Sequence, residues 1–111
     1  MPARGNGIYE FGPFRLDPAE RMLVSEGQAV ALSPKALNLL IALVSKAGRV
    51  VDKDELMREV WPDTFVEENN LTVNISAIRR ALGGAASDQR HIQTVPRRGY
   101  RFVATSWRES L

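Results

Sequence analysis

The chain has 111 residues, enough for one domain with a hydrophobic core of its own. It contains no cysteine and one histidine, His91, which excludes a disulfide framework and argues against a metal site or a catalytic pair. The net charge of +2 is too small to indicate a partner by itself, and no apolar run approaches the roughly 20 residues of a membrane helix.

Short strands are predicted for the first third of the chain. Residues 1–7 have no apolar core like that of a signal peptide, and we expect a flexible tail there. Turn signals at Gly12-Pro13, at Asp17-Pro18 and at residues 25–28 then separate four apolar runs. The runs are Tyr9–Phe11, Phe14–Leu16, Met22–Val24 and Ala29–Leu32. They predict a small antiparallel sheet whose role is packing.

A first helix begins at Ser33-Pro34. Serine can cap the free amides of the first turn, and proline is well tolerated at the first helical position. The residues that follow are strongly apolar, which predicts a mostly buried helix. We expect Gly48 to end the helix, since glycine often stands just past a helix terminus.

A second helix is predicted from Asp52, because Asp52 and Glu55 have the spacing of a capping box. Pro62 ends it. A loop of about seven residues leads to the next helix, so the pair forms a helix-turn-helix with a longer connection than usual.

The third helix, within residues 66–82, has two contrasting faces. Its apolar side chains form one stripe at helical spacing: Leu71, Ile75, Ile78 and Leu82. From Asn69 to Leu82 there is no acidic residue. The other positions carry amides, hydroxyls, small side chains and arginines: Asn69, Val73, Ser76, Ala77 and Arg80 opposite the stripe, with Thr72, Arg79, Asn70 and Asn74 on its flanks. This face suits close approach to nucleic acid, although a polar-faced helix with few charges is the alternative.

A β-hairpin is predicted after the third helix. Gly83-Gly84 ends that helix, and two β-rich runs, Ile92–Val95 and Tyr100–Val103, then flank Pro96-Arg97-Arg98-Gly99. We expect Gly99 to permit a turn that is closed to most residues. Arg97 and Arg98 would stand at the tip, where they either contact DNA or only keep the turn soluble.

Positive charge is concentrated in this last part. Residues 71–111 hold seven arginines, no lysine and two acidic residues, whereas residues 1–70 have a net charge of −3. Arginine suits bidentate contacts with phosphate and base edges. Any binding of nucleic acid is therefore expected in the C-terminal part.

The order of these elements resembles the winged helix-turn-helix effector domain of OmpR/PhoB-type transcriptional regulators. The resemblance covers about residues 8–104 and leaves 105–111 as a C-terminal tail or the start of a linker. It implies an α+β fold with an N-terminal four-stranded antiparallel sheet, three helices and a C-terminal β-hairpin wing. The segments that carry it are Leu32–Leu40, Asp54–Trp61, Val66–Leu82 and Thr94–Phe102.

The resemblance implies sequence-specific binding of double-stranded DNA for transcription regulation, with the third helix in the major groove and the wing in a minor groove. The family's contact positions, with Arg80 added from the helix pattern and three wing arginines, give the candidate set Asn69, Asn70, Thr72, Val73, Asn74, Ser76, Ala77, Arg79, Arg80, Arg97, Arg98 and Arg101. Several of these positions are often arginine or histidine in the family. Here they are asparagine, serine and alanine, which bears on base specificity.

The loop before the third helix can touch RNA polymerase in this family, which assigns that contact to Asp63, Thr64, Phe65, Val66, Glu67 and Glu68. The resemblance favours ToxR/CadC-like one-component regulators, in which this domain stands at the N-terminus. An effector domain of a two-component phosphorelay response regulator is the other reading.

We expect the domain to be cytoplasmic, even if the full-length protein is membrane-anchored, and to be a monomer that binds as two copies on tandem half-sites. No catalytic residues, metal, cofactor or small-molecule substrate are expected. The rival hypothesis is a winged helix that serves as a protein-interaction module with little DNA affinity.

Overall fold

A computed structural model describes residues 7–104 and 108–110 of the chain. The three helices are α1 (Pro34–Val44), α2 (Lys53–Val60) and α3 (Asn69–Ala81). The strands are β1 (Ile8–Phe11), β2 (Phe14–Asp17), β3 (Met22–Ser25), β4 (Gln28–Ala29), β5 (Val51–Asp52), β6 (Ile92–Val95), β7 (Gly99–Phe102) and β8 (Arg108–Ser110). The predicted order of strands, helices and hairpin is confirmed.

The N-terminal sheet is antiparallel and has the strand order β4-β3-β2-β1-β8. The three predicted turns are present, because Phe11 pairs with Phe14, Asp17 pairs with Met22, and Ser25 pairs with Gln28. β4 is shorter than predicted. β8 lies in the stretch predicted as a tail or linker and pairs with β1 instead. Of the predicted tail at residues 1–7, residues 1–6 lie outside the described part of the chain.

A second, three-stranded sheet joins the hairpin to the start of α2, in the order β5-β7-β6. β5 was not predicted. Asp52 is both a strand residue and the N-cap of α2, and its side chain makes no capping hydrogen bond. Glu55 instead accepts a hydrogen bond from Arg49 at 3.0 Å. The predicted capping box is therefore wrong, although the helix begins where expected.

The start of α1 is confirmed, because the Ser33 hydroxyl accepts a hydrogen bond from the backbone N–H of Ala36 at 3.1 Å. Its end was predicted wrongly. The helix stops at Val44, and Gly48 lies beyond a further turn, with φ +86°. The backbone N–H of Gly48 donates to the carbonyl of Phe102 in β7 at 3.0 Å. The glycine thus links the end of the α1 segment to the hairpin.

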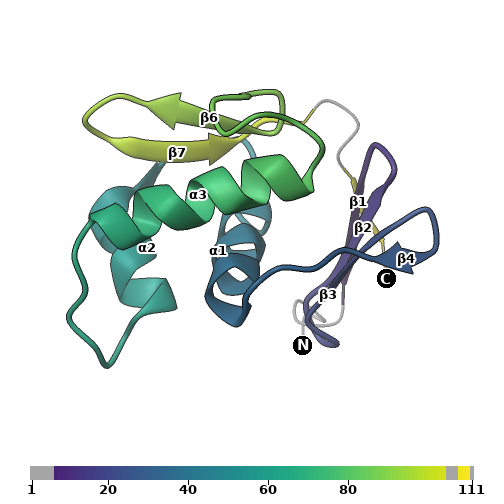
Figure 1. Cartoon of the computed structure of the whole chain (residues 1–111), viewed down its shortest axis with the longest axis horizontal. Coiled ribbons are helices and arrows are strands. Elements are labelled where there is room, and N and C mark those ends of the chain that lie inside the picture. Colours follow the sequence, from purple (N-terminus) through teal and green to yellow (C-terminus); the bar gives the residue numbers. More distant parts are fainter. Residues whose placement is uncertain (1–6, 105–107, 111) are drawn as a thin grey trace.

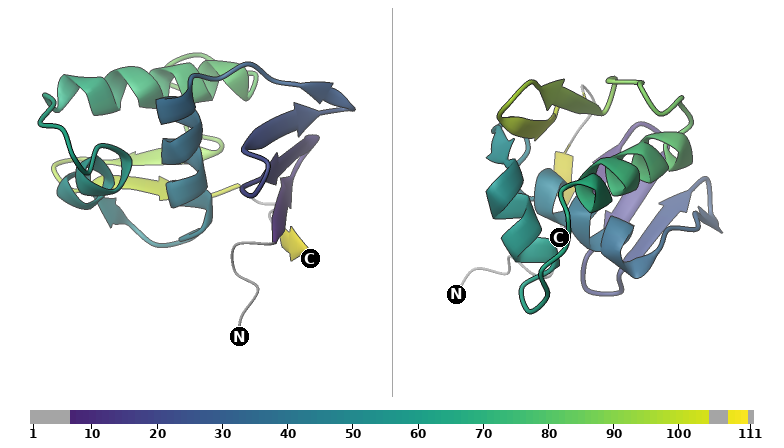
Figure 2. Two further views of the ribbon diagram at one scale, coloured as in Figure 1. Left: turned by 90° about the horizontal axis from the view of Figure 1, so that it is seen from below. Right: turned by 60° about the vertical axis from the view of Figure 1, so that its left-hand side comes forward.

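Helix α1 stands between the N-terminal sheet and the layer formed by α3 with the hairpin (Figures 1 and 2). Leu39, Leu40, Leu43 and Val44 are fully buried, and α1 contacts α2, α3 and β7. This arrangement makes α1 the support on which α3 rests. In the described part of the chain, the helices are too short or too polar to cross a bilayer.

His91 connects the N-terminal sheet to the hairpin. Its ring packs edge-on against the rings of Phe11 and Phe14, with centroids 5.9 Å and 5.8 Å away. Burial, and secondarily the charge of Arg90, lowers the pKa of His91, while Asp88 acts in the opposite direction. The neutral imidazole is thus the form that the fold prefers.

This preference predicts a pH dependence of stability. Because the pKa of His91 is lower in the folded than in the unfolded chain, the unfolded state binds more protons just below about pH 6.5. The stabilisation by the neutral His91 ring is present above about pH 6.5 and is lost as the pH falls through the pKa of His91 in the folded chain. Urea unfolding at about pH 7 and about pH 5.5 should show this loss in the wild type, and His91→Phe should reduce it. Equal losses in both proteins would contradict the prediction.

Candidate nucleic-acid interface

Helix α3 is held by its apolar stripe, as predicted. Leu71 and Ile78 are fully buried, and Ile75 and Leu82 are nearly so. Beyond the helix, Gly83 has φ +96°, the N–H of Gly83 donates to the carbonyl of Arg80, and the N–H of Gly84 donates to that of Arg79. These paired bonds form a Schellman motif that ends α3 where the two glycines predicted it.

The opposite face of α3 is open to solvent over most of its length. Val73 is 56% exposed, one of three large hydrophobic side chains with high exposure in the described residues. The exposed candidates are Asn69, Asn70, Thr72, Val73 and Arg80, and the partly buried ones are Asn74, Ser76 and Ala77. The helix thus presents small, polar and uncharged side chains along a surface that ends in one arginine.

Two asparagines on this surface are bound to the backbone of the same segment. The side-chain amide of Asn74 donates to the carbonyl of Asn70 at 2.7 Å, and that of Asn70 donates to the carbonyl of Glu67 at 3.3 Å. A bidentate contact from Asn74 to adenine would have to replace its bond to the helix.

Arg79 does not face outward, contrary to our expectation of a DNA contact. Its side chain is 8% exposed and turns towards the hairpin. One guanidinium nitrogen donates to the carbonyl of Ala86 at 3.1 Å, and the other donates to the carbonyl of Ile92 at 2.7 Å and to the hydroxyl of Thr94 at 2.8 Å. The flank position of Arg79 on α3 faces protein because these acceptors lie beside it.

The tip of the wing carries exposed arginines, as predicted. The backbone N–H of Arg98 donates to the carbonyl of Val95 at 3.0 Å, which closes the turn. Arg97 lies in the left-handed region, with φ +66°. That conformation is costly for a residue other than glycine, and retained strain of this kind often marks a functional position.

Gly99 is required for a different reason from the one predicted. Its φ is not in the left-handed region. It pairs with Asp52 of β5, and a Cβ at Gly99 would lie 1.9 Å from the carbonyl oxygen of Val51. Glycine is therefore needed here for the close approach of two strands, whereas the left-handed turn residue is Arg97.

Arg101 is set back from the tip and is partly buried. Its Nε donates to the side-chain carbonyl of Gln93 at 2.9 Å, directly across the hairpin. It supports the pairing of β6 and β7 and leaves the tip to Arg97 and Arg98.

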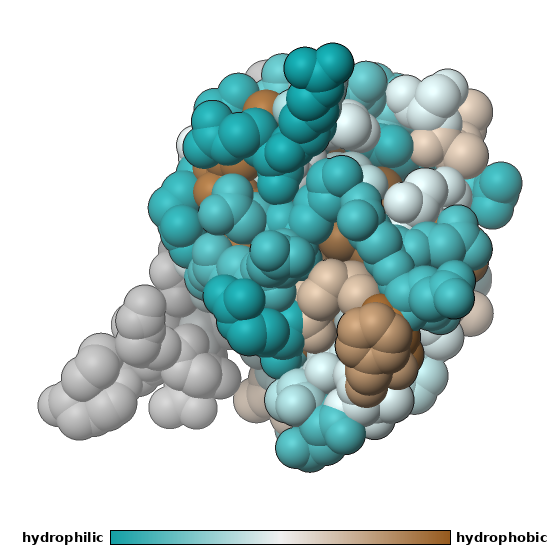
Figure 3. Space-filling view, turned by 90° about the vertical axis from the view of Figure 1, so that its left-hand side faces the viewer, coloured by the Kyte–Doolittle hydropathy of each residue, from teal (hydrophilic) through white to brown (hydrophobic). Residues whose placement is uncertain are grey.

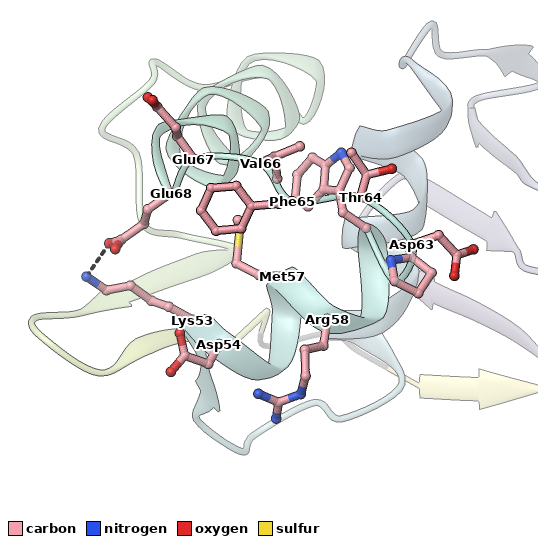
Figure 4. Close-up of a pocket in the computed structure, with 12 residues that line it drawn as sticks. Lys53, Asp54, Met57, Arg58, Asp63, Thr64, Phe65, Val66, Glu67 and Glu68 are labelled. Carbon is pink, nitrogen blue, oxygen red and sulfur yellow. Dashed lines mark hydrogen bonds and ion pairs between the residues drawn. The ribbon is translucent and has the colours of Figure 1, made fainter.

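Lys53, which the sequence did not single out, joins the wing tip to the start of α3. Its backbone N–H donates to the carbonyl of Arg98 at 3.0 Å, and its ammonium pairs with Glu68 at 2.7 Å (Figure 4). The Glu68 carboxylate raises the pKa of Lys53, chiefly through this hydrogen bond. The residue was missed because nothing in its local sequence marks a partner 45 residues further along the chain.

The loop between α2 and α3 borders a hollow of about 670 Å³, lined by residues of α2 and of the loop, Met57, Trp61 and Phe65 among them. Phe65 is 94% exposed. The face towards the left of Figure 1 is mostly hydrophilic, and a hydrophobic area stands out on it (Figure 3). Of the loop candidates, Asp63, Thr64, Phe65, Glu67 and Glu68 are exposed and Val66 is partly buried.

The strained backbone at the wing tip predicts that Arg97→Gly and Arg98→Gly differ in their effect on the free energy of unfolding. Arg97→Gly should leave the free energy of unfolding unchanged or raise it, because glycine adopts a positive φ freely. Arg98→Gly removes the same charge at a negative φ and should lower stability by about 0.5–1 kcal/mol. Urea unfolding of both variants measures the difference, and equal destabilisation would show that Arg97 is not strained.

The family model, the related sequences and the solved structures that resemble this chain all belong to transcriptional regulators. Residues 27–102, more than half of the chain, match the family described as transcriptional regulatory protein, C terminal. The transcriptional regulator HilA of Salmonella typhi is 37% identical over 97 residues, which cover 87% of this chain and 17% of HilA. The chain is thus similar to a small part of that longer regulator.

Two solved structures are similar over most of the chain. The response regulator DrrB of Thermotoga maritima, an OmpR/PhoB homologue, has a TM-score of 0.79 and 27% identity, covering 87% of this chain and 44% of DrrB. The DNA-binding domain of Klebsiella pneumoniae RstA, solved in complex with the RstA box, has a TM-score of 0.74 and 30% identity, covering 86% of this chain and 96% of that one. The chain therefore belongs to the transcriptional regulatory proteins of OmpR/PhoB type, as one of their winged helix-turn-helix domains.

Proposed function

We propose that this domain binds double-stranded DNA sequence-specifically and thereby regulates transcription, without a catalytic step. The observation that carries the proposal is the combined surface of α3 and the wing. An outward helix face without acidic residues lies beside a hairpin tip with two exposed arginines. The related RstA domain, solved with the RstA box, supports the same use of this fold.

In the proposed complex α3 enters the major groove, whose width admits one helix. Exposed Val73 can lie against a thymine methyl group, and Asn69 and Ser76 can hydrogen-bond to base edges. Arg80 can bind phosphate or guanine at the end of the helix. The wing reaches an adjacent minor groove with Arg97 and Arg98, where a narrow A·T-rich groove would attract their charge most strongly.

We further propose how the domain works within a longer regulator. One helix and one wing read a short site, so two copies on tandem half-sites about 10–10.5 bp apart would supply the selectivity that a genome requires. Without DNA the domain is proposed to be a monomer. Its place of action is the cytoplasm, as the output domain of a one-component or two-component signalling protein.

The loop between α2 and α3 is proposed to contact RNA polymerase. Phe65 is a large hydrophobic side chain with 94% exposure, and it borders the hollow between α2 and the loop. An exposed aromatic residue beside such a hollow is typical of an interaction surface. The loop leads directly into α3, so a protein bound there would lie next to the DNA.

Salt dependence is the first test of DNA binding. Arg80, Arg97 and Arg98 can provide three phosphate contacts, and the terminal nitrogens of Arg101, whose Nε bonds to Gln93, can add a fourth. Each contact adds about 0.9 to the slope of log affinity against log salt. Raising the salt concentration from about 50 to 200 mM should then weaken binding to a duplex roughly 40- to 150-fold. Fluorescence anisotropy measures this. Absent or salt-independent binding would instead favour the protein-interaction module.

A second test separates DNA binding from contact with polymerase. Phe65→Ser should leave duplex affinity unchanged but lower activated transcription in a reconstituted assay by roughly ten- to thirtyfold, the loss expected for one hot-spot aromatic residue. Met22→Ser is the matched control, since Met22 is also an exposed hydrophobic residue, 43% exposed, but lies on β3. Equal transcription from the two variants would remove the loop from the mechanism.

A further inference from the structure

The buried guanidinium of Arg79 lies where three segments meet: α3, the loop after it, and strand β6. Its hydrogen bonds to the carbonyl of Ala86, the carbonyl of Ile92 and the hydroxyl of Thr94 span 2.7–3.1 Å. All of these acceptors lie outside the helix. The side chain therefore connects the DNA-facing helix to the base of the wing hairpin.

A buried arginine at position 79 costs desolvation free energy that packing alone does not require. Its hydrogen-bond acceptors among the described residues are neutral, and its buried Nε has no partner among them. Burial lowers the pKa of the Arg79 guanidinium, opposed by Tyr100 and Asp88. A buried charge costs more than a leucine or methionine of similar volume, whereas directed hydrogen bonds fix an angle that apolar contacts leave loose.

The other end of α3 is attached more weakly. There Lys53 bridges Glu68 and the wing tip, but the side chains of this ion pair are 35% and 62% exposed. Exposed pairs of this kind are screened by salt and contribute little. The bonds of Arg79, one buried and two partly buried, are less open to solvent than this ion pair and form the stronger of the two links between α3 and the hairpin.

We propose that Arg79 is a positioning residue that fixes α3 relative to the wing, so that the major-groove and minor-groove contacts engage DNA as one rigid unit. This inference rests on the DNA-binding function proposed above. In this role Arg79 acts through its bonds to Ile92 and Thr94 and not by contact with DNA. Its removal should make the contributions of helix and wing independent of each other.

A double-mutant cycle tests this coupling. The wing variant Arg97→Asn with Arg98→Gln should weaken binding to a specific duplex in the wild-type background. In the Arg79→Met background the same change should weaken binding by about three- to tenfold less, because the Arg79 bonds no longer fix α3 and the wing to each other. Thr94→Val, which removes one acceptor and keeps the charge, should reduce the wing effect in the same direction.

The controls separate position from charge. Arg90→Gln removes a nearby exposed arginine paired with Asp88 and should leave the wing effect at its wild-type size. Arg79→Lys keeps the charge but not the planar fork, so it should behave like Arg79→Met. A wild-type wing effect in Arg79→Met, or in both Arg79→Lys and Thr94→Val, would overturn the proposal and make Arg79 a simple charge or packing residue.

A measurement without DNA keeps the inference separate from the proposed function. Residual dipolar couplings of the amides in α3 and in β6–β7 should fit one common orientation in the wild type and require two in Arg79→Met. If one orientation fits both proteins, Arg79 does not position the hairpin. If the couplings change as expected but wild-type protein binds no duplex, the positioning role stands and the DNA-binding proposal fails.

Discussion

Burial of one narrow apolar stripe of α3 against α1 is the interaction on which the proposed DNA-binding surface depends. Leu71, Ile75 and Ile78 leave almost no surface exposed, and each such side chain contributes about 1.5–3 kcal/mol. Because the stripe occupies one side of the helix, the other side must face outward whatever its composition. The sequence fills that outward side with small and polar residues and no acidic ones. The packing of the core and the character of the surface are thus two consequences of one helical period.

The wing depends on a different kind of contact. A two-stranded hairpin alone has no defined angle to a helix beside it. Here β5 pairs with β7, Gly48 bonds to Phe102, and Arg79 bonds to Ile92 and Thr94, so that several contacts together place the hairpin. The first contact requires Gly99, which has no side chain to separate the strands. These contacts, with Ile92, Tyr100 and Phe102 buried in the core, give the hairpin a defined place and leave its turn exposed, with Arg97 at the tip in a left-handed conformation.

Exposed hydrophobic side chains mark the two proposed binding surfaces. Val73 lies on the outward face of α3, and Phe65 lies in the loop that precedes it. The loop is acidic, with Asp63, Glu67 and Glu68, while the wing and the end of α3 are basic. This separation of charge would direct DNA to the helix and wing and away from the loop. Lys53 stands at the border between the two regions and pairs with the acidic residue closest to the helix.

The sequence by itself determined the features whose causes are local. The helical stripe, the Ser33 cap, the glycines after α3 and the hairpin turns each depend on residues within a few positions of one another, and all were predicted. Tertiary structure alone decided β5, β8, the role of Gly48 and the inward turn of Arg79. Strands of two or three residues leave no periodicity, so their partners across the fold define them. Arg79 lies on the flank of α3, where both directions are open to a long side chain. Its acceptors stand 7 to 15 residues further along the chain, and only folding brings them beside it.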